Sequence, residues 1–234
     1  WEELKKSALN GSLPLLNINE SVKRILTLVL KSQKMKNHNF DNNPKLKEHA
    51  LVTRKAGSEG IILLKNGNTL PLKNINNIAL FGSTSYEFIS GGTGSGDVAE
   101  AYTISLDEAL EKNGFKINEI AQQEYIRQNL KSPKKNEQSG GASLTDVINF
   151  LKTMINPPKP LDINYSPDLI KKISETSDIA IITIGRNSGE TADRKIKDDF
   201  LLSKSEIEMI KNICEIYHSK GKKVIVVLNI GGVI

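Results

Sequence analysis

Three short runs of apolar residues stand out along the chain. They are rich in isoleucine, valine and leucine, contain no regular polar positions, and occupy residues 78–81, 179–184 and 224–228. Uninterrupted apolar runs of this length are typical of strands that are covered on both faces, as in parallel sheets. The pattern therefore predicts three buried strands.

Segments with helical spacing of apolar residues separate these strands. Helices are predicted at residues 105–112, 119–129, 168–175 and 205–217. Ser203 and Glu206 form the pattern of a capping box at the start of the last helix. Alternation of strands with helices favours the α/β class with a parallel, doubly wound sheet.

Two further helices are predicted before the first strand. One follows Asn17, an N-cap residue with Glu20 three positions later, and the other starts at Pro44, because proline suits the first helical position. Residues 132–142 are rich in lysine, glycine and serine, a composition that predicts a loop.

Glu190 is the leading candidate for chemistry. The apolar run 179–184 ends at Gly185, and a loop with the sequence RNSGETADRK follows it. Ligands of open α/β sheets bind where such loops leave the carboxyl ends of parallel strands. The alternative interpretation is an ordinary solvated charge on a loop, which most exposed glutamates are.

A second candidate is the glycine-rich segment 91–96, which reads GGTGSG. Its backbone can approach a ligand closely, and Ser95 and Thr93 offer hydroxyl groups. A flexible tight loop is the simpler interpretation. A rival is dinucleotide binding, because residues 94–99 fit the pattern G-x-G-x-x-A, although that fingerprint normally follows its strand directly.

Composition excludes several classes of function. The 234 residues carry a net charge of +5, but aromatic residues make up only 5%, so the basic side chains have no stacking partners for nucleic acid. A single cysteine allows no disulfide within the chain, and the three histidines lack the spacing of metal ligands. No apolar run is long enough to span a bilayer, which predicts a soluble protein without a membrane span.

Three phrases of the sequence together resemble one family. Residues 59–72 read EGIILLKNGNTLPL, residues 91–97 read GGTGSGD, and residues 188–195 read SGETADRK. In this order they are similar to the C-terminal α/β sandwich domain of glycoside hydrolase family 3, which includes many β-glucosidases and β-xylosidases. The resemblance implies a three-layer α/β/α sandwich with a mostly parallel sheet, truncated at its C-terminus and occupying residues 43–234. Residues 1–42 would be the helical tail of a preceding (β/α)8 barrel plus a linker.

The resemblance also implies a reaction and its residues. It is the retaining hydrolysis of terminal β-linked sugars, without a metal or organic cofactor, and the substrate is a β-linked oligosaccharide or glycoside. Glu190 corresponds to the acid/base of the family, and Ser95 and Thr93 belong to the loop that borders its sugar site. Asp193 and Arg194 are expected to brace the loop after Glu190, since an arginine at this distance could hold a carboxylate through two hydrogen bonds. The alternative for these two residues is a pair of solvated loop charges. Asp198 and Asp199 are nearby competitors for the acid/base role.

The family's nucleophile is an aspartate of the barrel, and no matching phrase exists in these residues. The chain alone is therefore expected to be inactive, and an open sheet edge after residues 224–230 favours self-association. Two other functions stay open at this point: a non-catalytic carbohydrate-binding or interaction module, and the dinucleotide-binding domain.

Overall fold

A computed structural model describes residues 1–39, 42–93, 96, 100–130, 148, 152, 159–187 and 193–231. The chain forms two compact units, Trp1–Leu64 and Lys65–Ile234. The boundary between them follows the helix that ends at Gly60.

The first unit consists of three helices without a core of their own. They are α1 (Glu2–Leu9), α2 (Leu15–Lys31) and α3 (Leu46–Gly60), and none of them contains a buried residue. In α2 the apolar residues recur at helical spacing along one face, and Ile25, Leu28 and Leu30 are all more than half exposed. Burial against other protein is what normally stabilises such an amphipathic helix.

The second unit is built on a four-stranded parallel sheet with the order β2-β1-β3-β4. The strands are β1 (Asn77–Phe81), β2 (Lys116–Ile117), β3 (Ile179–Arg186) and β4 (Lys223–Ile230). Strand β1 pairs with β3 from Ile78–Ile179 to Phe81–Ile182, and β3 pairs with β4 over its whole length. The α/β class and the parallel sheet predicted from the sequence are thus confirmed.

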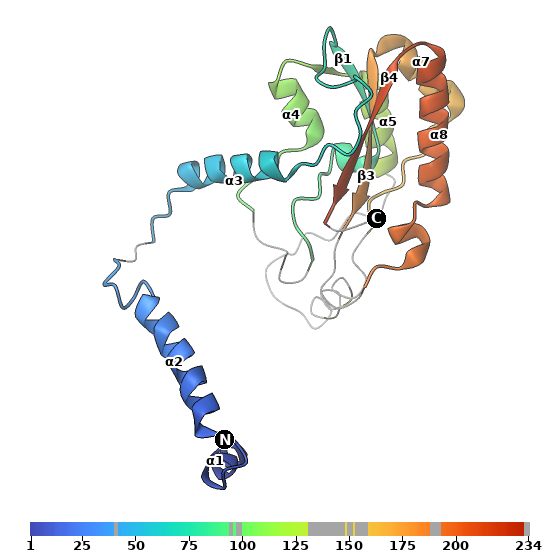
Figure 1. Cartoon of the computed structure of the whole chain (residues 1–234). Coiled ribbons are helices and arrows are strands. Elements are labelled where there is room, and N and C mark those ends of the chain that lie inside the picture. Colours follow the sequence, from blue (N-terminus) through green and yellow to red (C-terminus); the bar gives the residue numbers. More distant parts are fainter. Residues whose placement is uncertain are drawn as a thin grey trace. The chain divides into compact units, whose positions relative to one another are not determined.

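Helices cover the two faces of the sheet unequally (Figure 1). On one face α5 (Glu119–Asn129), α7 (Pro167–Thr176) and α8 (Lys204–Ser219) pack on alternate strand residues such as Phe81 and Ile182, and Tyr217 of α8 is fully buried there. On the other face α4 (Leu106–Lys112) packs near Ile78 and Leu80. This arrangement is the three-layer α/β/α sandwich expected from the sequence.

The predicted elements agree closely with the observed ones. The differences concern short elements and the ends of helices. The capping box at Ser203 is present, with its hydroxyl accepting from the Glu206 N–H and the Glu206 carboxylate accepting from the Ser203 N–H. Strand β2 was not predicted, because two residues are too few for a periodic signal. The first long helix begins at Leu15 instead of after Asn17. The loop predicted at 132–142 lies outside the described residues.

Candidate functional site

A crevice lies at the carboxyl ends of β1 and β3. From β1 the chain passes through α4 to β2 on one side, and later returns through α5 and α7 to β3 on the other side of β1. The carboxyl ends of β1 and β3 therefore form the topological switch point of the sheet, where open α/β sheets bind ligands. The crevice has a volume of about 970 Å³, and we call it the carboxyl-edge crevice.

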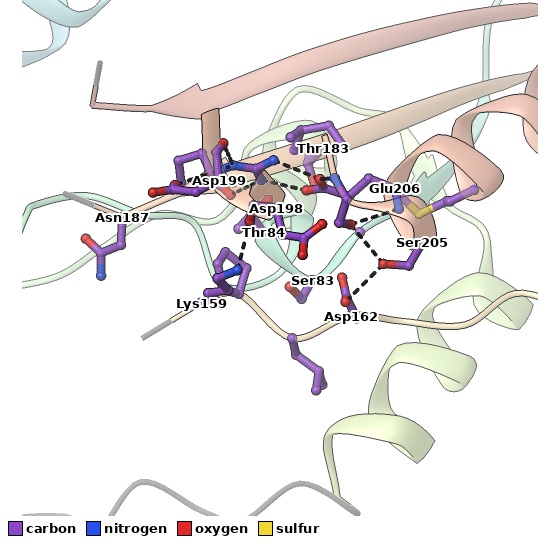
Figure 2. Close-up of a pocket in the computed structure, with 18 of the residues that line it drawn as sticks. Ser83, Thr84, Lys159, Asp162, Thr183, Asn187, Asp198, Asp199, Ser205 and Glu206 are labelled. Carbon is purple, nitrogen blue, oxygen red and sulfur yellow. Dashed lines mark hydrogen bonds and ion pairs between the residues drawn. The ribbon is translucent and has the colours of Figure 1, made fainter. Parts of the chain in front are cut away.

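Segments far apart in sequence, together with the end of β3, line the carboxyl-edge crevice (Figure 2). Ser83 and Thr84 follow β1, Lys159–Ile163 precede α7, and residues 193–206 connect the region beyond β3 to the start of α8. Within it, the Ser205 hydroxyl donates to Asp162 Oδ2 at 3.1 Å, and the Lys159 ammonium donates to the backbone oxygen of Asp198 at 2.8 Å. Most of the residues that line the crevice are polar or charged, and they can offer donors and acceptors to a hydroxyl-rich ligand.

Two glycines allow the backbone segments below the crevice to approach closely. Gly82 follows β1 at φ 92°, and a Cβ atom there would stand 2.4 Å from the backbone oxygen of Thr183. A Cβ atom on Gly185 of β3 would stand 2.4 Å from the Thr84 methyl carbon. Any larger residue at either place would force the ends of β1 and β3 apart.

A buried ion pair connects the end of β3 to the start of α8. The Arg186 guanidinium donates to both carboxylate oxygens of Glu206, at 2.6 and 2.7 Å, and the two side chains are only 8% and 12% exposed. Such a two-pronged pair fixes orientation as well as distance. Burial by itself would raise the pKa of Glu206, but hydrogen bonds from Arg186 and Ser203 outweigh it and hold that pKa below its ordinary value.

Asp199 connects both ends of the segment that follows β3. Its Oδ1 accepts from Arg194 Nη1 at 2.9 Å, and its Oδ2 accepts from the Lys195 N–H at 3.0 Å. Its backbone oxygen accepts from Arg186 Nε at 2.6 Å. Residues 187–193, which we call the Glu190 segment, therefore begin and end next to residues that Asp199 holds.

The glycine-rich segment has its own anchors. The Asn229 side chain of β4 accepts from the Ile89 N–H at 2.7 Å and donates to the Ile89 oxygen at 3.0 Å. The Ser90 hydroxyl donates to Glu100 Oε1 at 2.6 Å, which joins the two ends of this loop. A Cβ atom on Gly91 would lie 2.9 Å from the Gly96 oxygen, so the loop folds tightly at this point.

The residues predicted from the sequence fall into two groups. Asp193 and Arg194 line the carboxyl-edge crevice, as do the competitors Asp198 and Asp199. Thr93 lies in the described part of the glycine-rich segment and is not among the residues that line this crevice. Glu190 and Ser95 lie outside the described residues.

Sequence reasoning missed Arg186 and Asn229, and it read Glu206 only as a helix cap. Each of the two missed residues is a polar residue near the end of an apolar strand, Arg186 in IAIITIGR and Asn229 in KVIVVLNI. A polar residue in that position points to the ligand-binding edge of a parallel sheet. The partner of each residue is distant in sequence, so no local pattern identifies it.

Other chemistries find no support in the described residues. Among them no group of three or more histidine, cysteine, aspartate or glutamate side chains could hold a metal ion. None of the helices described is long and apolar enough to cross a membrane. The strand that a dinucleotide fingerprint at 94–99 would need next to it, β1, already ends at Phe81.

The sheet topology and the switch-point crevice define an α/β domain with a crevice at the carboxyl edge of a parallel sheet. Residues 61–234 match the sequence model of the glycosyl hydrolase family 3 C-terminal domain. The chain belongs to this family, as its resemblance had indicated.

Relatives and solved structures agree with this assignment. The chain is 30% identical over 216 residues to β-glucosidase A of Butyrivibrio fibrisolvens, covering 80% of this chain and 23% of that protein. It is 26% identical to a β-glucosidase of Ruminococcus albus, of which it covers 18%. A solved β-glucosidase 3B of Thermotoga neapolitana, in complex with α-D-glucose, matches 99% of this chain at 37% identity with a TM-score of 0.76. The chain spans less than a third of the length of each of these proteins.

Proposed function

We propose that this chain is part of a retaining β-glycosidase that hydrolyses terminal, non-reducing β-linked sugars, with β-glucosides as first substrates and β-xylosides as the alternative. Membership of glycoside hydrolase family 3 supports the reaction class, and the names of the relatives support glucose. In the same proposal, residues 1–42 are the tail of a preceding barrel, and residues 43–234 belong to the sandwich domain.

The observation that carries the proposal is that the described residues on either side of the Glu190 segment line the crevice at the switch point. Glu190 is four residues from Arg186 and four from Arg194, and both of these arginines line the carboxyl-edge crevice. Four residues span at most about 14 Å, so we assign Glu190 to the same edge of the sheet as the crevice. A carboxyl group there is suited to protonate a leaving oxygen and then to activate water.

A retaining mechanism needs a second carboxylate, about 5–5.5 Å from the first, that attacks the anomeric carbon. We assign this nucleophile to a part of the enzyme outside residues 1–234. In the first step Glu190 gives its proton to the glycosidic oxygen while the nucleophile forms the glycosyl-enzyme bond. In the second step the Glu190 carboxylate takes a proton from water, and that water releases the sugar with retained configuration.

Asp193 and Arg194 support the Glu190 segment in this proposal, and Ser95 and Thr93 contact the sugar. The 234-residue chain by itself is expected to be inactive, because it supplies a proton donor without a nucleophile. We expect that this chain releases no nitrophenol from nitrophenyl β-glucoside or nitrophenyl β-xyloside, whereas the full-length enzyme, assayed beside it, does. The ratio of kcat/KM for the two sugars in the full-length enzyme decides between them.

Replacement of Glu190 by alanine in the full-length enzyme tests the assignment. Acid/base groups contribute about 10²- to 10⁴-fold, so alkyl glucosides should lose this factor, whereas dinitrophenyl glucoside needs no acid and should still form the glycosyl-enzyme. Azide, a small anion that needs no base, should then restore turnover and yield β-glycosyl azide.

Asp193→Ala and Asp198→Ala serve as matched controls, because each removes one carboxylate from the same edge of the sheet. Neither control should respond to azide. If azide restores turnover to one of the aspartate variants and leaves Glu190→Ala unchanged, the proton donor has been assigned to the wrong residue.

A further inference from the structure

The two ends of the Glu190 segment are joined through a single residue, Asp199. Arg186, the last residue of β3, precedes the segment, and Arg194 and Lys195 follow it. Asp199 accepts hydrogen bonds from all three of these residues, two through its carboxylate and one through its backbone oxygen.

The carboxylate of Asp199 uses both oxygens. Oδ1 accepts from the Arg194 guanidinium and Oδ2 from the Lys195 N–H, and the side chain is 24% exposed. An asparagine there would keep only one acceptor oxygen and would present an NH₂ group to a donor. The Asp199 carboxylate therefore differs from a solvated surface charge, for which the same substitution would change little.

At the other end of the segment, Arg186 connects this cluster to the start of helix α8. Arg186 holds Glu206 at the start of α8 through two hydrogen bonds, and the Glu206 carboxylate also caps that helix. One end of the Glu190 segment is thus attached to strand and helix directly. The other end, at Arg194 and Lys195, is attached to Arg186 through Asp199.

We propose that Asp199 is a positioning residue for the acid/base reaction, which it serves by fixing the distal end of the Glu190 segment at Arg194 and Lys195. This inference rests on the proposed function of Glu190. Asp199 itself donates no proton to the substrate, because its two oxygens are occupied by protein donors. Its contribution is therefore expressed only through Glu190.

A displacement of about 1 Å of a catalytic group costs about 10²-fold in rate. Loss of the Asp199 contacts should therefore reduce proton transfer by about 10- to 100-fold, less than loss of Glu190 itself. Only substrates whose leaving group needs a proton should react more slowly. Bond cleavage with a leaving group of low pKa should be almost unchanged.

A double-mutant cycle in the full-length enzyme tests this. The variants are Asp199→Asn, Glu190→Ala and the double variant, each assayed by kcat/KM with an alkyl β-glucoside and with dinitrophenyl β-glucoside. Glu215→Gln is the control for charge removal, because Glu215 is 64% exposed on α8 and far from the reaction in this proposal. Arg194→Gln removes the guanidinium that donates to Asp199 Oδ1. This variant takes the place of Asp199→Asn if Asp199→Asn does not fold.

The expected result has three parts. Asp199→Asn lowers kcat/KM about 10- to 100-fold for the alkyl glucoside and less than about threefold for the dinitrophenyl glucoside. In the Glu190→Ala background the same substitution changes the alkyl rate by less than about twofold, since residues that act as one unit are not additive. Glu215→Gln changes kcat/KM for neither substrate.

Equal losses for both substrates, or a full Asp199 effect in the Glu190→Ala background, would overturn the positioning role while leaving Glu190 as the acid/base. The same conclusion holds if Asp199→Asn has no effect at all. If Glu190→Ala affects neither substrate, the proposed function fails first, and the role of Asp199 fails with it. These outcomes separate the two proposals.

Discussion

The ion pair between Arg186 and Glu206 should be the most sensitive polar contact of the described sandwich. The substitution Glu206→Gln keeps the size of the side chain and removes its charge. The Arg186 guanidinium, 8% exposed, would then retain the backbone oxygens of Gly185 and Asp199 as acceptors, and its remaining counter-charge would be the Asp199 carboxylate, whose Oδ1 lies 3.9 Å from Arg186 Nε.

The expected loss can be worked out from these contacts. Removing one partner of a buried ion pair costs about 3–5 kcal/mol. The glutamine oxygen can still accept one hydrogen bond, from Arg186 or from the Ser203 N–H, which recovers about 1 kcal/mol. The free energy of unfolding should therefore fall by about 2–4 kcal/mol, a large part of the 5–15 kcal/mol that is usual for a domain.

Urea denaturation of the 234-residue chain, followed by circular dichroism at 222 nm, measures this loss. With a slope of about 2 kcal/mol per molar urea, the midpoint should fall by roughly 1–2 M at unchanged slope. Glu215→Gln is the control, since Glu215 is exposed on the same helix and 3.9 Å from Lys211, and it should change stability by less than about 0.5 kcal/mol.

A double variant sharpens the test. Arg186→Met combined with Glu206→Leu removes both charges, and it should be less destabilised than the sum of the two single changes, because no unpaired charge remains buried. A loss below about 0.5 kcal/mol for Glu206→Gln alone would refute the reasoning, since the pair would then behave as a surface salt bridge.

Two further outcomes are expected. Because the folded-state pKa of Glu206 lies below its ordinary value of 4.5, the stability it contributes is fully present above that pH and is lost as the pH falls through the folded-state pKa. The stability difference between the wild type and Glu206→Gln should therefore be constant from pH 5 to 7 and shrink below about pH 4.5; a difference independent of pH down to pH 2 would contradict this. Gly185→Ala should destabilise the domain by about 1–3 kcal/mol in thermal unfolding, since its methyl group would stand 2.4 Å from a Thr84 carbon, whereas Gly57→Ala in exposed α3, with nothing within 4 Å, should raise helix content slightly. Equal tolerance of alanine at both glycines would argue against the close approach of β1 and β3.

Local patterns of the sequence determined most of the secondary structure. The apolar runs around Ile78, Ile179 and Val224 predicted three strands, and β1, β3 and β4 contain all three. The capping box before α8 was predicted from Ser203 and Glu206 and is present. Strand and helix propensity and capping depend on residues within a few positions of each other, so the sequence contains them directly.

The sequence also determined the family, because residues 61–234 match the model of the glycosyl hydrolase family 3 C-terminal domain. It identified the edge of the sheet at which a ligand should bind, through the loop that follows residues 179–184. The catalytic role of Glu190 and the sugar contact of Ser95 still rest on the resemblance to glycoside hydrolase family 3, because both residues lie outside the described residues.

The tertiary structure decided which side chains meet. Arg186 and Glu206 are 20 residues apart, and Asn229 and Ile89 are 140 residues apart, so their hydrogen bonds depend on the order in which the strands pair. The two-residue strand β2 exists only because β1 offers it backbone partners. Pairing order is a property of the whole chain, because burying both faces of one sheet requires all its strands and helices at once, and no window of neighbouring residues contains that requirement.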